Sequence, residues 1–395
     1  MLGSGKLYLD RPIVADGSNV AVVYFKNLRT VKDWCCTREV GDIYMRRSRD
    51  GGSTWQPEVR LTTAQSGLRV ALELAGSTMH LTWMDYRSGK WDLYYRRSTD
   101  GGATWRPEVR LVGGTNNVGA ERPDIVARGS SVHVFWMDAR DDQPACYTAP
   151  VCPEIYYKRS LDGGATWSPD KRLTFDAPWS ARPIAATSQA NTLVVSYEQQ
   201  VAGDDTGNEI FALRSADNGR TWRKPQRLVS ATGDSSHNFT AGNRTSAFVA
   251  WHDDRTGNNE IYFRESTAGG ASWGPVERIT NARGDSIVPF LAVTSHYVHS
   301  IWGDDRSGSY QTWYSRRRLA PGISNIKTVP RVVGMTLQKA RRTLVAAGLR
   351  VGLVRYQASR SVNRDVVISQ RPSAAPVTRI RTGSRVSLVV SSGRA

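Results

Sequence analysis

One eight-residue segment, Ser48-Arg49-Asp50-Gly51-Gly52-Ser53-Thr54-Trp55, decides the fold because it recurs along the chain. Glycines permit a tight turn, the aspartate can accept backbone N–H bonds across it, and the tryptophan can pack between sheets. Later copies end at Trp105, Trp167, Trp222 and Trp273. Because the aspartate recurs, we interpret it as structural in the four copies that have it: Asp50, Asp100, Asp162 and Asp217.

A second pattern recurs six times, as a run of β-forming residues that ends in an aromatic, such as Met79–Trp83 and Val132–Trp136. Four short strands per ~50 residues, separated by turns, are typical of a propeller blade. The sequence therefore predicts a mainly β chain with a six-bladed β-propeller over residues 1–320. The sixth blade lacks the eight-residue segment, and we expect the N-terminal run Leu7–Leu9 to complete it.

The recurring segments resemble the Asp box (S-x-D-x-G-x-T-W) of the sialidase-like, or bacterial neuraminidase repeat, family. The resemblance implies an active site at the end of the propeller opposite the Asp boxes. It also implies glycoside hydrolysis or non-catalytic binding, since such propellers serve both.

Arginines stand where four of the inner strands begin, in Asp10-Arg11-Pro12, Leu68-Arg69-Val70, Glu121-Arg122-Pro123 and Ala181-Arg182-Pro183. Guanidinium groups suit the recognition of carboxylate, sulfate or phosphate. We therefore take Arg11, Arg69, Arg122 and Arg182 as candidate substrate-binding residues. The family uses an arginine triad for its substrate's carboxylate, and of these four only Arg11, in Arg11-Pro12-Ile13, resembles a motif of that triad. The alternative is that they pair with neighbouring blades as features of the repeat.

Four carboxylates break the repeat on the predicted active face, and they are candidate catalytic residues: Asp10, Asp33, Glu121 and Glu198. Two of them could perform acid/base glycoside hydrolysis. The family's nucleophilic tyrosine is not identifiable, because the last inner strand reads Ile287-Val288-Pro289-Phe290. Enzymatic activity is favoured without that residue being assigned. The alternative for each carboxylate, and the commoner case for any single one, is an ordinary surface acid.

The four cysteines, Cys35, Cys36, Cys146 and Cys152, fall in the two longest loops predicted on that face. Pairing of Cys146 with Cys152 and of Cys35 with Cys36 is our first choice among three possible connectivities. Disulfides suit an extracytoplasmic compartment. No Cys/His spacing typical of zinc is present, so we expect no metal and no cofactor.

The net charge of +17 is concentrated in the tail, since residues 326–395 hold 14 of the 53 Lys and Arg residues but one acid, Asp365. The segments V-P-x-V-V-G-M-T, A-G-L and V-I-S-Q-x-P resemble a PASTA domain, an α+β module with a helix predicted at Leu337–Ala347. We place it at 328–395, after a linker at 321–327. The resemblance implies a partner in peptidoglycan or another cell-wall polymer. Nucleic acid is not expected, because the tail has one aromatic, Tyr356.

These features predict an extracellular or wall-associated monomer that binds glycan, although no signal peptide stands at Met1–Lys6. No apolar run is long enough for a membrane span. We favour a glycoside hydrolase acting on acidic or cell-surface glycans, tethered to the cell wall by the PASTA domain. The alternatives are a lectin-like glycan-binding propeller, with platforms such as Trp34, Trp91 or Trp179, and a protein-interaction propeller.

Overall fold

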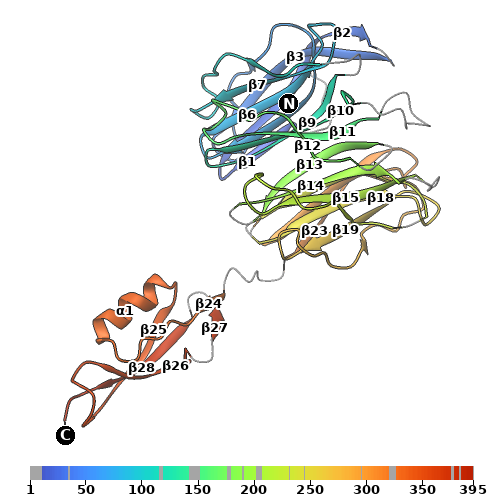
Figure 1. The fold of residues 1–395 in the computed structure, drawn as a ribbon. Helices are drawn as coiled ribbons and strands as arrows, with labels where there is room; N and C mark the ends of the chain where they lie inside the picture. The colour runs from blue at the N-terminus through green and yellow to red at the C-terminus, as the bar shows by residue number, and fades with distance from the viewer. Residues whose placement is uncertain are drawn as a thin grey trace. The chain divides into compact units, whose positions relative to one another are not determined.

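The computed structural model describes residues 11–33, 36–114, 119–141, 152–175, 179–188, 191–201, 207–230, 232–243, 245–294, 296–319, 326–374, 378–381 and 384–394. The chain forms two compact units, residues 1–318 and 319–395 (Figure 1). The predicted mainly β class is confirmed, since strands dominate both units and one α-helix is described. No helix among the described residues is long and apolar enough to cross a membrane.

Antiparallel sheets follow one another along the first unit, from blue to gold in Figure 1. An eight-stranded sheet comes first. It comprises β1 (Ile13–Asp16), β2 (Asn19–Lys32), β3 (Thr37–Ser48), β4 (Val59–Arg60), β5 (Gly67–Ala75), β6 (Thr78–Asp85), β7 (Asp92–Ser98) and β8 (Val109–Val112). It consists of two four-stranded groups, β1–β4 and β5–β8, joined by one residue pair, Gly41 with Gly67.

Three four-stranded sheets and one three-stranded sheet complete the unit. The first four-stranded sheet contains β9 (Ala120–Arg128), β10 (Ser131–Asp138), β11 (Glu154–Ser160) and β12 (Lys171–Arg172), and the second contains β13 (Ser180–Ser188), β14 (Thr192–Gln200), β15 (Asn208–Ser215) and β16 (Gln226–Arg227). The third contains β17 (Ser235–Gly242), β18 (Ala247–Asp253), β19 (Glu260–Ser266) and β20 (Glu277–Arg278). The three-stranded sheet contains β21 (Ser286–Val293), β22 (Tyr297–Asp304) and β23 (Gln311–Arg318). The first strands of successive groups are neighbours, from β1 through β5, β9, β13 and β17 to β21. The expected closing run Leu7–Leu9 lies outside the described residues.

The eight-residue segments connect the third strand of a group to the fourth, as the repeat predicts. In the third copy, the Asp162 carboxylate accepts from the backbone N–H and the hydroxyl of Thr166 at 2.9 and 2.6 Å. Gly163 N–H donates to Ser130 O in the β9–β10 turn at 2.7 Å. Asp50, Asp100 and Asp217 accept equivalent bonds in their own copies. These segments therefore lie at the end of the sheets where the first and second strands are joined.

The long connection expected as a loop after Tyr24 is instead a continuation of the β2–β3 hairpin. The two strands stay paired up to Lys32 with Thr37, and their register shifts between Lys26 and Arg29. Val31 and Val40 are buried in the core along this extension, which gives the hairpin an apolar face. The extension carries the tip of the hairpin well beyond the length of the other strands.

The second unit packs one helix against a small sheet. Helix α1 (Leu337–Ala346) begins at Thr336, whose hydroxyl accepts from Lys339 N–H, and Gly348 follows it at φ +74°. Ala340 and Leu344 of α1 are buried against the sheet residues Val386 and Leu388. The sheet has the order β25 (Arg350–Gln357), β28 (Arg385–Ser391), β26 (Val367–Arg371), and β24 (Ile326–Thr328) pairs with β27 (Arg379–Arg381).

Candidate functional site

The inner strands β5, β9, β13, β17 and β21 all contain a β-bulge close to their beginning. One residue in each bulge adopts a left-handed backbone with φ between 46° and 53°. Non-glycine residues adopt this conformation at a cost, and bulges often re-aim side chains beside functional sites. The five residues are Arg69, Arg122, Arg182, His237 and Val288. This column of bulges lies at the end of the strands opposite the Asp-box segments.

Asp33 and Glu121 contact one guanidinium group at this end of the unit. Arg38 Nε lies 2.6 Å from Asp33 Oδ2, and Arg38 Nη2 lies 3.1 Å from Glu121 Oε1. Asp33 and Arg38 flank the tip of the extended β2–β3 hairpin, whereas Glu121 stands at the start of β9. The extension therefore positions Asp33 beside the inner strand of the third group.

The Asp33 carboxylate is further fixed by two neutral donors. The indole N–H of Trp91 donates to Asp33 Oδ2 at 3.0 Å, and Cys36 N–H donates to Asp33 Oδ1 at 2.9 Å. The Arg38 guanidinium also lies over the Trp91 ring, 5.4 Å from its centroid. Trp91 is fully buried, so it orients a carboxylate and is not the exposed platform that the lectin-like alternative expects.

Glu198 is the second buried glutamate of the site. Its Oε1 accepts from His237 N–H at 2.6 Å, and its Oε2 lies 3.4 Å from Arg182 Nε. Burial raises the pKa of Glu198, and the charges of Arg182 and Arg122 counter only part of that shift. Glu198 stands where β14 pairs with the start of β13, at Ala181.

Burial also raises the pKa of Glu121, while the charges of Arg38, Arg122 and Arg69 act in the opposite direction. Arg122 therefore influences both Glu121 and Glu198. A glutamate whose pKa is raised by burial can keep a proton closer to neutral pH, which general acid catalysis requires.

His237, whose backbone N–H donates to Glu198, also carries a neutral imidazole. Burial first, and then the charges of Arg182, His252, Arg122 and Arg69, lower the pKa of His237 to about 3. Its ring stacks on that of His252, with centroids 4.7 Å apart. The charges of Arg69 and Arg122 thus act on both His237 and Glu121, and the charge of Arg182 acts on His237 and Glu198.

Ser236 and His252 form a hydrogen bond of 2.8 Å, which raises the question of a serine nucleophile. Val288 N–H donates to His252 Nδ1 at 3.1 Å, so the proton of the neutral ring is on Nε2. His252 Nε2 must then donate to Ser236 Oγ and cannot take its proton. This tautomer excludes an activated Ser236.

Arg11 occupies a different place from the other predicted arginines. Its Nε lies 2.8 Å from Asp124 Oδ1 and its Nη1 lies 3.8 Å from Glu73 Oε2, while Nη2 donates to Ala185 O. These partners come from β9, β5 and β13, so Arg11 ties inner strands together. We therefore leave Arg11 out of the candidate site.

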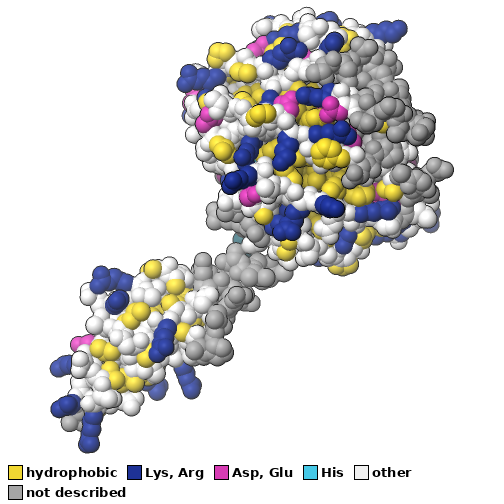
Figure 2. All heavy atoms as spheres, viewed as in Figure 1, with side chains coloured by type: hydrophobic (Ala, Val, Ile, Leu, Met, Phe, Trp, Pro, Cys, Tyr) yellow, Lys and Arg dark blue, Asp and Glu magenta, His cyan; other side chains and the backbone are white. Residues whose placement is uncertain are grey.

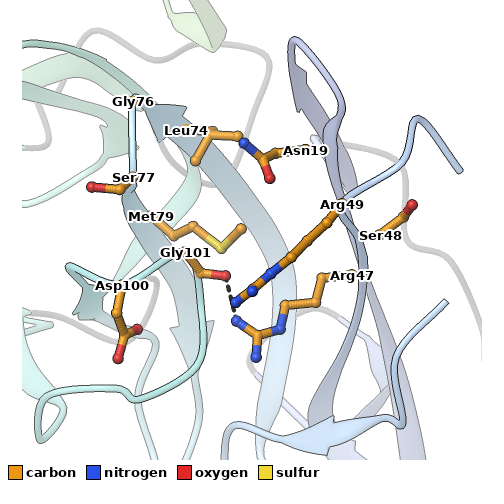
Figure 3. Close-up of a pocket in the computed structure, with 10 residues that line it drawn as sticks. All are labelled: Asn19, Arg47, Ser48, Arg49, Leu74, Gly76, Ser77, Met79, Asp100 and Gly101. Atoms are coloured by element: carbon orange, nitrogen blue, oxygen red, sulfur yellow. Dashed lines mark hydrogen bonds between the residues drawn. The ribbon is translucent and has the colours of Figure 1, made fainter. Parts of the chain in front are cut away.

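A pocket of about 260 Å³ lies at the Asp-box end, between the first two strand groups (Figure 3). Arg47 Nη1 donates to Gly101 O across it at 2.6 Å, and Arg49 and Met79 also line it. Its one lining carboxylate, Asp100, is engaged within its own turn. The pocket therefore has no second carboxylate for acid/base chemistry.

Three of the four predicted carboxylates lie at this end of the sheets: Asp33 and Glu121 share Arg38, and Glu198 contacts Arg182. The fourth, Asp10, lies outside the described residues. Cys36 and Cys152 are both disulfide-bonded, whereas Cys35 and Cys146 lie outside the described residues. Among the described residues, no group of three or more His, Cys, Asp or Glu side chains is placed to hold a metal ion.

Sequence reasoning missed Arg38 and His237. The repeat itself could have found His237, because it occupies the position that Arg182 and Arg122 occupy in earlier groups. Nothing in the repeat points to Arg38, since within the described parts of the chain such an extended hairpin occurs in the first group alone.

Comparison with known proteins supports the division of the chain into a large β unit and a C-terminal PASTA domain. Residues 327–392 match the PASTA domain model, which confirms the PASTA resemblance. No curated protein matches the sequence. The first unit is similar in fold to a mutant of the α-L-arabinofuranosidase Arb93a from Fusarium graminearum bound to an iminosugar inhibitor, at 14% identity and a TM-score of 0.50 over 76% of this chain and 89% of that one.

Other solved structures match at lower scores. The NanB sialidase from Streptococcus pneumoniae matches at 11% identity and a TM-score of 0.47, over 72% of this chain and 63% of that chain. The endo-arabinase from Bacteroides thetaiotaomicron matches at 13% identity and a TM-score of 0.39, over 65% of this chain and 96% of that one. At these identities the likeness concerns the fold.

Proposed function

We propose that the first unit is a six-bladed, sialidase-like β-propeller that hydrolyses glycosidic bonds in acidic or cell-surface glycans outside the cell. The observation that carries this proposal is the pair Asp33 and Glu121 on one guanidinium, with the charges of Arg122 and Arg69 also acting on Glu121. Glycoside hydrolysis requires two carboxyl groups within ~5–9.5 Å of each other, and a shared Arg38 holds these two close together.

In this proposal Glu121 is the general acid. Its raised pKa lets it carry the proton that passes to the leaving glycosidic oxygen as the bond to the anomeric carbon breaks. A second carboxylate, Asp33 or Glu198, then takes a proton from the attacking water or itself attacks the anomeric carbon. Arg122, which acts on both glutamates, stabilises the negative charge that Glu121 acquires when it gives up its proton.

Arg69, Arg122 and Arg182 supply the binding of an acidic sugar. Guanidinium groups bind carboxylates through paired, charge-assisted hydrogen bonds. The left-handed bulges fix the backbone of these arginines, so little order is lost on binding.

A non-catalytic, glycan-binding propeller is the second candidate. It is favoured by the ion pairs of Arg38, because a carboxylate that is fully occupied by a guanidinium and by Trp91 can be purely structural. A catalytic Asp33 must exchange one of those contacts for substrate.

Turnover of a panel of aryl glycosides distinguishes the glycoside hydrolase from the non-catalytic, glycan-binding propeller. The panel contains sialic acid, other nonulosonic acids, uronic acids and arabinose as the sugar, and glycan-array binding is measured in parallel. Release of the aryl group by the wild type but not by Glu121→Gln supports the enzyme. Array binding without turnover of any glycoside rejects the enzyme and supports the binding protein.

The PASTA domain tethers the propeller to the cell wall in this proposal, and the last two residues of the predicted linker, 326 and 327, belong to its strand β24. Co-sedimentation with purified cell walls tests the tether. We expect the full chain to sediment and a chain ending at Arg318 to remain in solution. Equal retention of both chains would reject a tether through the PASTA domain.

A further inference from the structure

One face of the second unit's sheet carries arginines and is left open. Val386, Leu388 and Val390 alternate along β28 and are buried beneath α1, so Arg385, Ser387 and Val389 point to the opposite face. The strand register places Arg350 of β25 beside Arg385, Arg355 beside Val389, and Arg371 of β26 beside Ser387. We define these four residues, Arg350, Arg355, Arg371 and Arg385, as the arginine face.

All four arginines of this face are exposed, and none forms an ion pair within the described part of the chain. The one acid of the region, Asp365, lies off the three strands, where its carbonyl accepts from Leu337 N–H beside the start of α1. Figure 2 shows basic side chains projecting around this unit, whereas both signs of charge are interspersed over the first unit.

Arg350 and Arg385 stand directly opposite each other on adjacent strands. Like charges in such a pair are destabilising, and strands lie only about 4.8 Å apart. An anion between the two guanidinium groups relieves this repulsion. A phosphate diester suits the position, because its two non-bridging oxygens can each accept from a different arginine.

Two small polar residues stand beside Val389 on this face. Ser387 and Ser369 lie between the arginines, and Ser387 Oγ accepts from Leu353 N–H at 3.2 Å, which leaves the Ser387 hydroxyl proton for a ligand. Arg355 lies five positions after Arg350 along β25, which corresponds to about 16 Å of strand. This length exceeds a single phosphate and fits a polymer with several.

We propose that the arginine face binds a linear wall polymer that carries phosphate groups, which gives the tether of the proposed function its chemical partner. Single-stranded nucleic acid is disfavoured because stacking aromatics accompany charge in such sites, and Tyr356 pairs in register with the inward-facing Val390.

The test measures binding of the full chain to labelled long-chain inorganic polyphosphate across a salt series. We expect the variant R350Q/R355Q/R371Q/R385Q to bind at least tenfold more weakly and to lose about 3 from the slope of log affinity against log salt. The matched control K339Q/R341Q/R342Q/R360Q removes four exposed charges from α1 and the loop after β25, and we expect less than a threefold loss. Equal losses in the two variants would overturn the proposal, because net charge alone would then explain binding.

Further measurements complete the experiment. Replacing the four arginines by lysine should leave a clear loss, and full retention would reject recognition by guanidinium geometry. Poly-L-glutamate, oligo-dT and phosphatidylglycerol vesicles should each bind more weakly than polyphosphate, and tighter binding of any of them would reject a phosphate polymer. Circular dichroism confirms folding of each variant. Glycoside turnover is measured separately, so loss of this face leaves the catalytic proposal untouched.

Discussion

Asp33 and Glu121, far apart in the chain, are held together by a single guanidinium, that of Arg38. The relationship depends on a hairpin that is extended in the first strand group and on an inner strand of the third group. The extended β2–β3 hairpin departs from the repeat, whereas β9 is an inner strand of the kind that the repeat predicts. The catalytic proposal depends on the contact between these two elements.

Loss of the proposed acid should abolish turnover without unfolding the protein. Glu121→Gln keeps the shape of the side chain and removes its proton transfer, so we expect kcat on the best aryl glycoside to fall by about 10²- to 10⁴-fold. Glu108→Gln, at a half-exposed partner of Arg87, is the control and should retain activity. Turnover by Glu121→Gln within threefold of the wild type would exclude Glu121 as the acid.

The bulge arginines should discriminate acidic from neutral sugars. We expect Arg69→Gln and Arg182→Gln to raise KM about tenfold or more for a glycoside with a carboxylate, since a hydrogen bond to a charged group contributes about 1.5–3 kcal/mol. The KM for the matching glycoside, in which an amide replaces the carboxylate, should rise much less. Arg106→Gln, at the Asp-box end, should change neither KM. Equal effects on acid and amide would argue against carboxylate recognition.

The contribution of Glu73 to stability should fall as the pH rises from about 4.5 to about 7. Burial raises the pKa of Glu73 from its ordinary 4.5 to about 7, even with Arg11 nearby. The folded protein therefore holds this proton over a range where the unfolded chain has released it. The stabilisation is complete below about 4.5 and is lost by about pH 7, by at most about 3 kcal/mol.

Glu73→Gln should lose this contribution, so the difference in unfolding free energy between wild type and variant should shrink from pH 4.5 to pH 7. Buried histidines such as His237 and His252, whose pKa values burial lowers to about 3 and about 4, make stability rise over the same range in both proteins. Urea unfolding of both proteins at pH 4.5, 6 and 7.5 measures this difference in unfolding free energy. Glu277→Gln, at an exposed partner of Arg317, should keep the wild-type profile. An unchanged slope in Glu73→Gln would mean that Glu73 does not titrate in this range.

The Asp-box aspartates should stabilise turns and leave catalysis alone. Asp162→Ala removes the acceptor of two Thr166 bonds, so we expect a lower Tm with unchanged kcat. Ala268→Asp restores the missing acceptor in the fifth copy, where Gly270 N–H already donates to Ser266 Oγ, and should raise Tm.

Low pH should remove the difference in Tm between the wild type and Asp162→Ala. Hydrogen bonds from Ser48 and Thr54 lower the pKa of Asp50 to about 2, and Asp162 shifts in the same direction through Thr166 and Ser160. This stabilisation is present above about pH 4 and is lost as the pH falls toward 2. A Tm gap between wild type and Asp162→Ala that persists at pH 2 would contradict this account.

Val288 is the β-branched member of the left-handed column, at φ +52°. Asparagine tolerates this conformation better, so we expect Val288→Asn to raise the free energy of unfolding by about 1 kcal/mol if the Val288 N–H bond to His252 is kept. Val298→Asn, at a buried position of β22, should instead destabilise the protein. Destabilisation by both would show that side-chain burial outweighs backbone strain at position 288.

The sequence by itself determined the strands of the repeat, the position of each Asp-box turn, and the PASTA unit with its helix. These features depend on local turn chemistry and on apolar periodicity, which neighbouring residues encode. It also selected Asp33, Glu121 and Glu198, because each departs from its own repeat. Only the tertiary structure placed Arg38 between two carboxylates, moved Arg11 away from the other arginines, and turned Trp91 from a surface platform into a buried donor. Those outcomes depend on contacts between strands that are distant in the chain, and no local pattern specifies which distant side chain will arrive.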